Sequence, residues 1–279
     1  MIETEFQAGA VTLTALDNQG GGTVIIGLHG YMDNAASLEP LAPFLHNYRF
    51  IALDMAGHGS STHRPYGSHY NLVDYLQDLH AMIEHQGFEQ VVLLGHSLGG
   101  ILATMYAGIF PDKVSGVVSI DACGPLTESA ETTAAQLRDS IESRYKRSRN
   151  RLKVVDLEQA VAARCQISDI SEPHARAILQ RNLTQDAGGH YFWASDPKLR
   201  TRSNLRLTEE QAKALMASIT CPVYFAAASD SFKNLRERYE QRASWFKHAQ
   251  CDYFNGGHHI HMEKPEEIGP AVANFVEQL

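Results

Sequence analysis

Near-continuous apolar runs recur along the chain and alternate with segments of helical spacing. Runs in which almost every side chain is apolar or small are typical of strands buried on both faces, as in a mostly parallel sheet. These runs are Thr23–His29, Phe50–Asp54, Val91–Gly95, Val114–Ile120, Pro222–Ala228 and Gln250–Phe254. An additional early strand is predicted at Val11–Leu16. Predicted helices lie between and after them, at Ala35–His46, Leu72–His85, Ile101–Ile109 and Pro265–Leu279. Alternating strands and helices predict an α/β fold.

The pattern changes in the middle of the chain. From Leu126 to about Ile219 the sequence is helical, polar and charged, and no strand-like apolar run occurs there. After Cys221 the alternation of strand and helix resumes. The sequence therefore predicts a core domain formed by residues 1–125 and 220–279, with a helical insertion at residues 126–219.

Composition narrows the function classes. A chain of 279 residues that is 44% hydrophobic can bury a large core. Its net charge of −8 argues against nucleic acid or an anionic membrane as the main partner. We find no apolar run of membrane-spanning length and no signal-peptide pattern, so we expect a cytoplasmic protein that acts on a small molecule. Composition does not indicate the oligomeric state.

The four cysteines do not form a recognisable metal or disulfide framework. None belongs to a Cys-x-x-Cys pair, and none lies at zinc-ligand spacing with a pair of histidines. The chain also has no glycine-rich phosphate loop or dinucleotide fingerprint. We therefore expect neither a metal nor a cofactor.

The stretch Val91–Gly100 carries the strongest chemical signal. It combines a buried strand, the pentapeptide Gly95-His96-Ser97-Leu98-Gly99 and a following helix. This arrangement fits the nucleophile elbow Gly-x-Ser-x-Gly, which presents a serine hydroxyl on a sharp turn. Glycine is needed beside the serine because a side chain would crowd that turn. The sequence predicts Ser97 as a nucleophile.

Several stretches in this order resemble the α/β-hydrolase fold with a helical cap. They are Leu28-His29-Gly30-Tyr31, Leu53–Ser60, Gly95–Gly100, Ser229-Asp230 and Gly257–Pro265. The resemblance covers nearly the whole chain. It implies an eight-stranded, mostly parallel sheet flanked by helices, with the cap inserted after the sixth strand. Within that fold, one stretch of the predicted cap is similar to the matching stretch of serine hydrolase-like proteins. It contains Trp193 and Asp196-Pro197-Lys198-Leu199.

The remaining site residues are predicted from chain order and from this resemblance. A serine nucleophile needs a histidine base, and that histidine needs a carboxylate on its other nitrogen. His258, in a glycine-containing loop before the last helix, matches the base position. Asp230 and Asp121 each follow a predicted strand, and we favour Asp230 as the acid, with Asp121 as the alternative.

Two backbone N–H groups are expected to bind the oxyanion of the reaction intermediate. The resemblance assigns them to Leu98, after the nucleophile, and to Tyr31, in the loop after the strand ending at His29. Met32 and Trp193 are candidate residues of the substrate pocket.

Together these features predict a serine esterase that cleaves a small to medium ester, thioester or lactone through an acyl-serine intermediate. Two alternatives stay open. The same residues on this fold can cleave carbon–carbon bonds, and the fold can also serve as a non-catalytic ligand-binding scaffold. An intact Ser97, His258 and aspartate argue against the scaffold, because ligand binding alone does not need all three.

Overall fold

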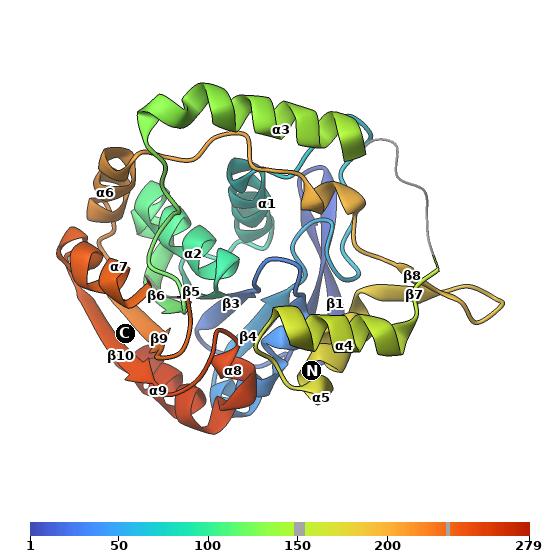
Figure 1. Cartoon of the computed structure of the whole chain (residues 1–279). Helices are drawn as coiled ribbons and strands as arrows, with labels where there is room; N and C mark the ends of the chain where they lie inside the picture. The colour runs from blue at the N-terminus through green and yellow to red at the C-terminus, as the bar shows by residue number, and fades with distance from the viewer. Residues whose placement is uncertain (148–153, 233–234) are drawn as a thin grey trace.

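One eight-stranded sheet organises the molecule. The computed structural model describes residues 1–147, 154–232 and 235–279 (Figure 1). The strand order is β1-β2-β4-β3-β5-β6-β9-β10. Pairing is antiparallel between β1 and β2 and between β2 and β4, and parallel across the rest of the sheet. The strands are β1 (Ile2–Ala8), β2 (Val11–Asp17), β3 (Val24–Leu28), β4 (Arg49–Leu53), β5 (Val91–His96), β6 (Val114–Ile120), β9 (Val223–Ala228) and β10 (Ala249–Phe254). The predicted fold class is confirmed.

Helices cover both faces of the sheet. On one face, α1 (Leu72–His85) and α2 (Leu98–Ile109) pack in one hydrophobic cluster, and on the other face α9 (Pro265–Glu277) packs in a second cluster. The strands at the centre, β5 and β6, are buried along nearly their whole length. This double burial explains their uninterrupted apolar sequence. It also fixes the carboxyl ends of these strands, which carry the candidate site.

The segment between β6 and β9 is mainly helical, as predicted. It contains α3 (Thr133–Arg147), α4 (Leu157–Ile167), α5 (Glu172–Arg181) and α6 (Glu209–Ala217). In Figure 1, α3 lies along one side of the face with the strand ends and α4 along the other. We call residues 126–219 the inserted segment. A small hairpin of β7 (Leu183–Gln185) and β8 (Tyr191–Trp193) was not predicted. Its strands are too short for their pattern to be recognised.

Two other parts of the core differ from the prediction. The predicted helix Ala35–His46 is two 3₁₀ helices, Ala35–Ser37 and Glu39–Leu45, because two prolines lack the N–H that an α-helix requires. Strand β1 was missed, since its charged and polar residues face solvent at the sheet edge. The remaining helices are α7 (Leu235–Arg242), α8 (Ile260–Glu263) and 3₁₀ turns at Pro111–Lys113, Ala130–Thr132, Pro197–Arg200 and Ala243–Trp245. In the described ranges, no helix is long and apolar enough to span a bilayer.

Candidate active site

Ser97 lies on a strained turn between β5 and α2. Its φ of 50° and ψ of −112° belong to a conformation that side-chain-bearing residues rarely adopt, and its N–H donates to the Ile120 carbonyl at 2.9 Å. The flanking glycines leave no room for a side chain. A Cβ at Gly95 would lie 2.2 Å from the backbone of Gly99, and a Cβ at Gly99 would lie 1.9 Å from the Leu28 carbonyl oxygen. The elbow that the sequence predicts is therefore present.

His258 is held beside the elbow by two contacts. Its Nδ1 lies 2.5 Å from Oδ2 of Asp121, and its backbone carbonyl lies 2.8 Å from Nε2 of His96, the residue before Ser97. Asp121 is buried, whereas the His258 side chain keeps 18% of its surface exposed. A carboxylate on Nδ1 leaves Nε2 as the nitrogen available to a substrate or a nucleophile.

The predicted contact between Asp230 and His258 is wrong. Asp230 is exposed at the end of β9, and its backbone N–H donates to the Gly256 carbonyl at 2.9 Å. The end of β9 does lie beside the His258 loop, as we expected, but through its backbone. One residue later, the Ser231 hydroxyl donates to Oδ2 of Asp121 and lies 3.5 Å from His258 Nδ1. The carboxylate comes from β6, which lies between the elbow strand β5 and β9.

Asp121, like Ser97, has a positive φ, and hydrogen bonds hold both its backbone and its carboxylate. Its φ is 52°, and its N–H donates to the Ala226 carbonyl at 2.9 Å. Oδ1 accepts from the Ala228 N–H at 3.0 Å, while Oδ2 accepts from Ser231 and His258. Every acceptor oxygen of this buried carboxylate is thus used. Sequence reasoning missed Ser231, whose role could not be read from a motif.

The two expected oxyanion-binding residues border the same cavity as Ser97. Leu98 is the first residue of α2, so its N–H belongs to the helix terminus, where backbone donors have no partner within the helix. Tyr31 lies in the loop after β3, and its hydroxyl donates to the Leu199 carbonyl at 3.0 Å. Ser97 therefore opens into a space that both predicted donor residues reach.

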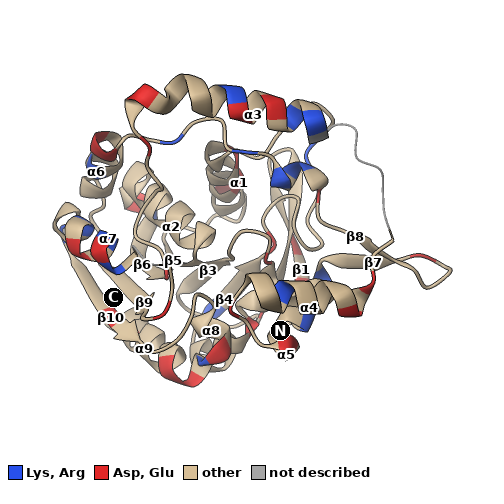
Figure 2. Ribbon diagram, viewed as in Figure 1, with Lys and Arg blue, Asp and Glu red and all other residues tan. Residues whose placement is uncertain are grey.

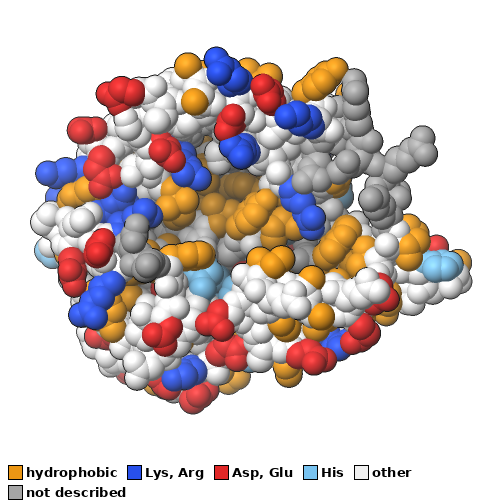
Figure 3. Space-filling view, viewed as in Figure 1, with side chains coloured by type: hydrophobic (Ala, Val, Ile, Leu, Met, Phe, Trp, Pro, Cys, Tyr) orange, Lys and Arg blue, Asp and Glu red, His pale blue; other side chains and the backbone are white. Residues whose placement is uncertain are grey.

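The cavity above Ser97 has a volume of about 670 Å³. Figure 3 shows a hollow in this face whose inner wall is largely hydrophobic, with charged side chains at its margin. Its aliphatic lining comes from Leu98, Ile101 and Leu126. The other lining residues, besides Tyr31 and Ser97, are Glu128, Thr132, Ala135, Gln136, Asp139, Thr201, Arg202, Ser203 and Arg206.

Charges at the margin of the cavity are paired. Arg202 contacts Asp139, and Arg206 lies 3.0 Å from Glu128. Figure 2 shows acidic and basic residues interspersed along α3 and its neighbours. The cavity lining therefore presents no excess of either sign.

Met32 and Trp193, the predicted pocket residues, are not among those that line this cavity. Met32 packs against the main core with φ of 63°. Trp193, on β8, packs against the small cluster of α4 and α5, and the guanidinium of Arg200 lies 5.4 Å from its ring. Neither residue lines this cavity, which lies beside α3, so their assignment to the substrate pocket stays a prediction.

Known proteins share this architecture. A sequence model of the family described as alpha/beta hydrolase fold matches residues 23–265. The chain belongs to the α/β-hydrolase fold family. It is 28% identical over 269 residues to a serine hydrolase-like protein of Danio rerio, covering 92% of this chain and 82% of that one. An sn-1-specific diacylglycerol lipase of Mus musculus is 26% identical, with 94% and 83% covered. The crystal structure of a hypothetical protein of Pseudomonas aeruginosa is 32% identical, with a TM-score of 0.90 and coverage of 99% and 100%.

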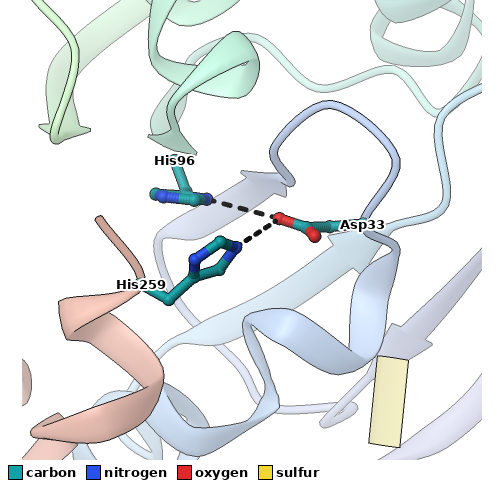
Figure 4. Close-up of side chains that lie close together, drawn as sticks. All are labelled: Asp33, His96 and His259. Atoms are coloured by element: carbon teal, nitrogen blue, oxygen red, sulfur yellow. Dashed lines mark ion pairs between the residues drawn. The ribbon is translucent and has the colours of Figure 1, made fainter. Parts of the chain in front are cut away.

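In this α/β hydrolase, a second polar cluster lies behind the candidate site. Asp33, from the loop after β3, has His96 Nδ1 at 3.6 Å and His259 Nε2 at 3.5 Å from its Oδ2 (Figure 4). Arg164 of α4 donates to the other oxygen, Oδ1. Burial alone would raise the pKa of Asp33, but the imidazole of His259 and the charge of Arg164 lower it well below its ordinary value. No motif indicated this cluster.

Proposed function

We propose that the protein is a serine hydrolase whose nucleophile, base and acid are Ser97, His258 and Asp121. The observation that carries the proposal is the contact of 2.5 Å between Asp121 Oδ2 and His258 Nδ1. The His258 carbonyl in turn contacts His96, the residue before Ser97 in the strained turn. Family membership and the names of the curated relatives support hydrolytic chemistry. Asp121 replaces Asp230 in the role that the sequence favoured.

The proposed reaction is acyl transfer in two halves. The Ser97 hydroxyl attacks the substrate carbonyl carbon while His258 Nε2 takes its proton, and Asp121 stabilises the imidazolium that forms. The N–H groups of Tyr31 and Leu98 bind the oxyanion. The bond to the leaving group then breaks, and the leaving group takes the proton from Nε2. Water repeats the sequence on the acyl-serine, releasing the acid and restoring Ser97.

The cavity favours an uncharged, moderately apolar acyl group. Three aliphatic side chains line it, and its charged side chains are paired with one another. Substrates of this kind include esters, thioesters and lactones of small to medium size. We propose further that the inserted segment acts as a cap, because α3 and residues 201–206 supply half of the residues that line the cavity.

A fluorophosphonate probe tests the function. We expect it to label the purified protein at Ser97, as found by mass spectrometry of the modified peptide, because the reagent requires a base-activated serine. Ser97→Ala should not be labelled and should melt at or above the wild-type temperature, since the strained turn loses no core contact. A folded wild-type protein that resists labelling would favour a ligand-binding scaffold.

Substitution at Ala135 tests the substrate assignment. Ala135 is an exposed residue of α3 that lines the cavity, so Ala135→Trp should fill space without disturbing the core. We expect kcat/KM for long acyl esters to fall by about 10–200-fold relative to acetyl esters, the range that pocket fit supports. Ala134→Trp, on the same helix but outside the lining, is the matched control. An equal loss for every acyl length in Ala135→Trp would contradict the assignment.

A further inference from the structure

We propose that Arg164 and His96 are positioning residues, which tie the inserted segment to the loops that carry the oxyanion donor and the base. The inference rests on the proposed function and extends it beyond the three reacting residues. Its starting point is the juxtaposition of the partly buried Arg164 with the buried Asp33 and His96 and with the His258 carbonyl. Neither Arg164 nor His96 is proposed to contact the substrate.

The tautomer of His96 follows from its partner. A backbone carbonyl can only accept, so His96 Nε2 must carry the proton that it donates to the His258 carbonyl. This bond joins the end of β5, which presents Ser97, to the base loop. Burial also lowers the pKa of His96 to about 4, so its ring is neutral near pH 7 and its Nδ1 carries a lone pair.

That lone pair faces Asp33, which therefore needs a donor from elsewhere. Nδ1 of His96 and Oδ2 of Asp33 lie 3.6 Å apart, beyond hydrogen-bond distance, and Nδ1 has no hydrogen-bond partner among the described residues. Arg164 supplies the donor: its Nη2 contacts Asp33 Oδ1 and lies 3.4 Å from His259 Nε2. The guanidinium of Arg164, from α4, thus neutralises the carboxylate that faces His96.

Asp33 also fixes the loop of the predicted oxyanion donor. Its N–H donates to the Gly30 carbonyl at 3.1 Å, closing the turn that contains Tyr31. Gly30 lies between the side chains of Asp33 and His96, with no room for a side chain of its own. A Cβ there would lie 2.6 Å from Asp33 Oδ2 and 2.8 Å from His96 Nδ1. A second bond from the inserted segment, Asn182 Nδ2 to the Met32 carbonyl at 3.1 Å, holds the same turn. A shift of α4 would therefore move the Tyr31 turn through Asp33 and the base loop through His259, the residue after His258.

The same cluster could be considered as a metal site, because Asp33, His96 and His259 each offer one ligand atom and these atoms lie within 4.8 Å of one another (Figure 4). The guanidinium of Arg164 argues against a cation there. It already contacts Asp33 and lies 3.4 Å from His259, so a metal ion would meet a like charge at close range. The observations favour Arg164 as the resident cation of the cluster.

The test combines Arg164→Met with hydrogen exchange and rate measurements on the full chain. We expect faster amide exchange at residues 29–34 and 256–262, slower fluorophosphonate labelling of Ser97, and a fall in kcat of about 10–100-fold with KM changed by less than about threefold, as expected for misplaced catalytic groups. Arg164→Lys should recover much of the rate. Arg176→Met, which removes the same charge from an exposed ion pair in the same segment, is the control.

Two further variants separate positioning from folding. The double change Asp33→Asn with Arg164→Met removes both charges, so it should melt near the wild-type temperature yet remain slow. His96→Gln, whose amide can still donate to the His258 carbonyl, should keep at least about a tenth of the rate, whereas His96→Met should lose about 10–100-fold. A full rate in the double variant, or equal rates for His96→Gln and His96→Met, would overturn the proposal.

The exchange measurement also keeps the two proposals distinguishable. If the wild-type protein is not labelled, the proposed function fails, whatever the exchange result. If amide exchange in Arg164→Met is the same as in the wild-type protein, the proposed link between α4 and the two loops fails. Micromolar ZnCl₂ is the metal probe. We expect it to leave the melting temperature and the labelling rate unchanged. A rise in melting temperature that requires Asp33 and His96, or activity removed by EDTA, would overturn the proposal in favour of a metal site.

Discussion

Asp121→Asn is expected to lower turnover by about 10⁴-fold, the loss seen when the acid of a serine triad is replaced by its amide. Asparagine can keep the bond from the Ala228 N–H through its oxygen, so the fold should be retained. Its NH₂ group would then face His258 Nδ1 and favour the tautomer that protonates Nε2. A protonated Nε2 cannot take the proton of Ser97.

Asp230→Asn is the matched control. Asp230 is exposed and contributes only its backbone to the His258 loop, so its variant should keep turnover within a few-fold of the wild-type rate. Initial rates with a short-chain ester, measured beside the melting temperature, decide the matter. A large loss in Asp230→Asn with normal turnover in Asp121→Asn would restore the assignment that the sequence favoured.

The sequence could predict those parts of the site where the backbone conformation restricts which residues fit. The elbow at Ser97 requires glycine where the chain approaches itself closely, and such a requirement leaves a motif. The buried central strands likewise have a composition that only double burial explains. Strand β1 has no such signature, because its position at the sheet edge lets alternate residues face water.

Side-chain direction at the strand ends could not be read from the sequence. After β9 the chain turns so that Asp230 faces solvent and Ser231 faces Asp121, a difference of one residue that no pattern encodes. Contacts between distant segments were equally hidden. Arg164 and Asp33 are 131 residues apart, and nothing in either stretch indicates the other. Trp193 was assigned to the pocket from its loop alone, and its packing against α4 and α5 could not be read from that loop.

Acid is expected to destabilise the fold strongly, because several histidines are buried as neutral rings. Burial lowers the pKa of His29 and His96 to about 4, that of His58 to about 3, and that of His261 well below its ordinary value of 6.5. Between pH 6.5 and 4 the unfolded chain therefore binds more protons than the folded protein, and the free energy of unfolding falls as pH falls. Asp78 opposes this, since burial raises its pKa to about 6.

The three histidines whose pKa is lowered to about 3 or 4, against the one carboxyl, leave a net uptake of roughly two protons on unfolding near pH 5, and His261 adds to it. Each proton corresponds to about 1.4 kcal/mol per pH unit, so we expect the free energy of unfolding to fall by at least roughly 3 kcal/mol per pH unit there. Urea denaturation at pH 7.5, 6.0 and 5.0 measures the slope. A free energy of unfolding that is constant over this range would contradict neutral burial.

One substitution assigns part of that slope to a single ring. Neither ring nitrogen of His261 has a hydrogen-bond partner among the described residues, and its ring lies 4.1 Å from that of His96. A phenyl ring has nearly the same shape and no proton to bind, so His261→Phe should reduce the slope, by at most about 1.4 kcal/mol per pH unit. His85→Gln, at an exposed histidine near the end of α1, should leave the slope unchanged. Equal slopes for His261→Phe and the wild-type protein would mean that His261 is charged, or accessible to water, in the folded state.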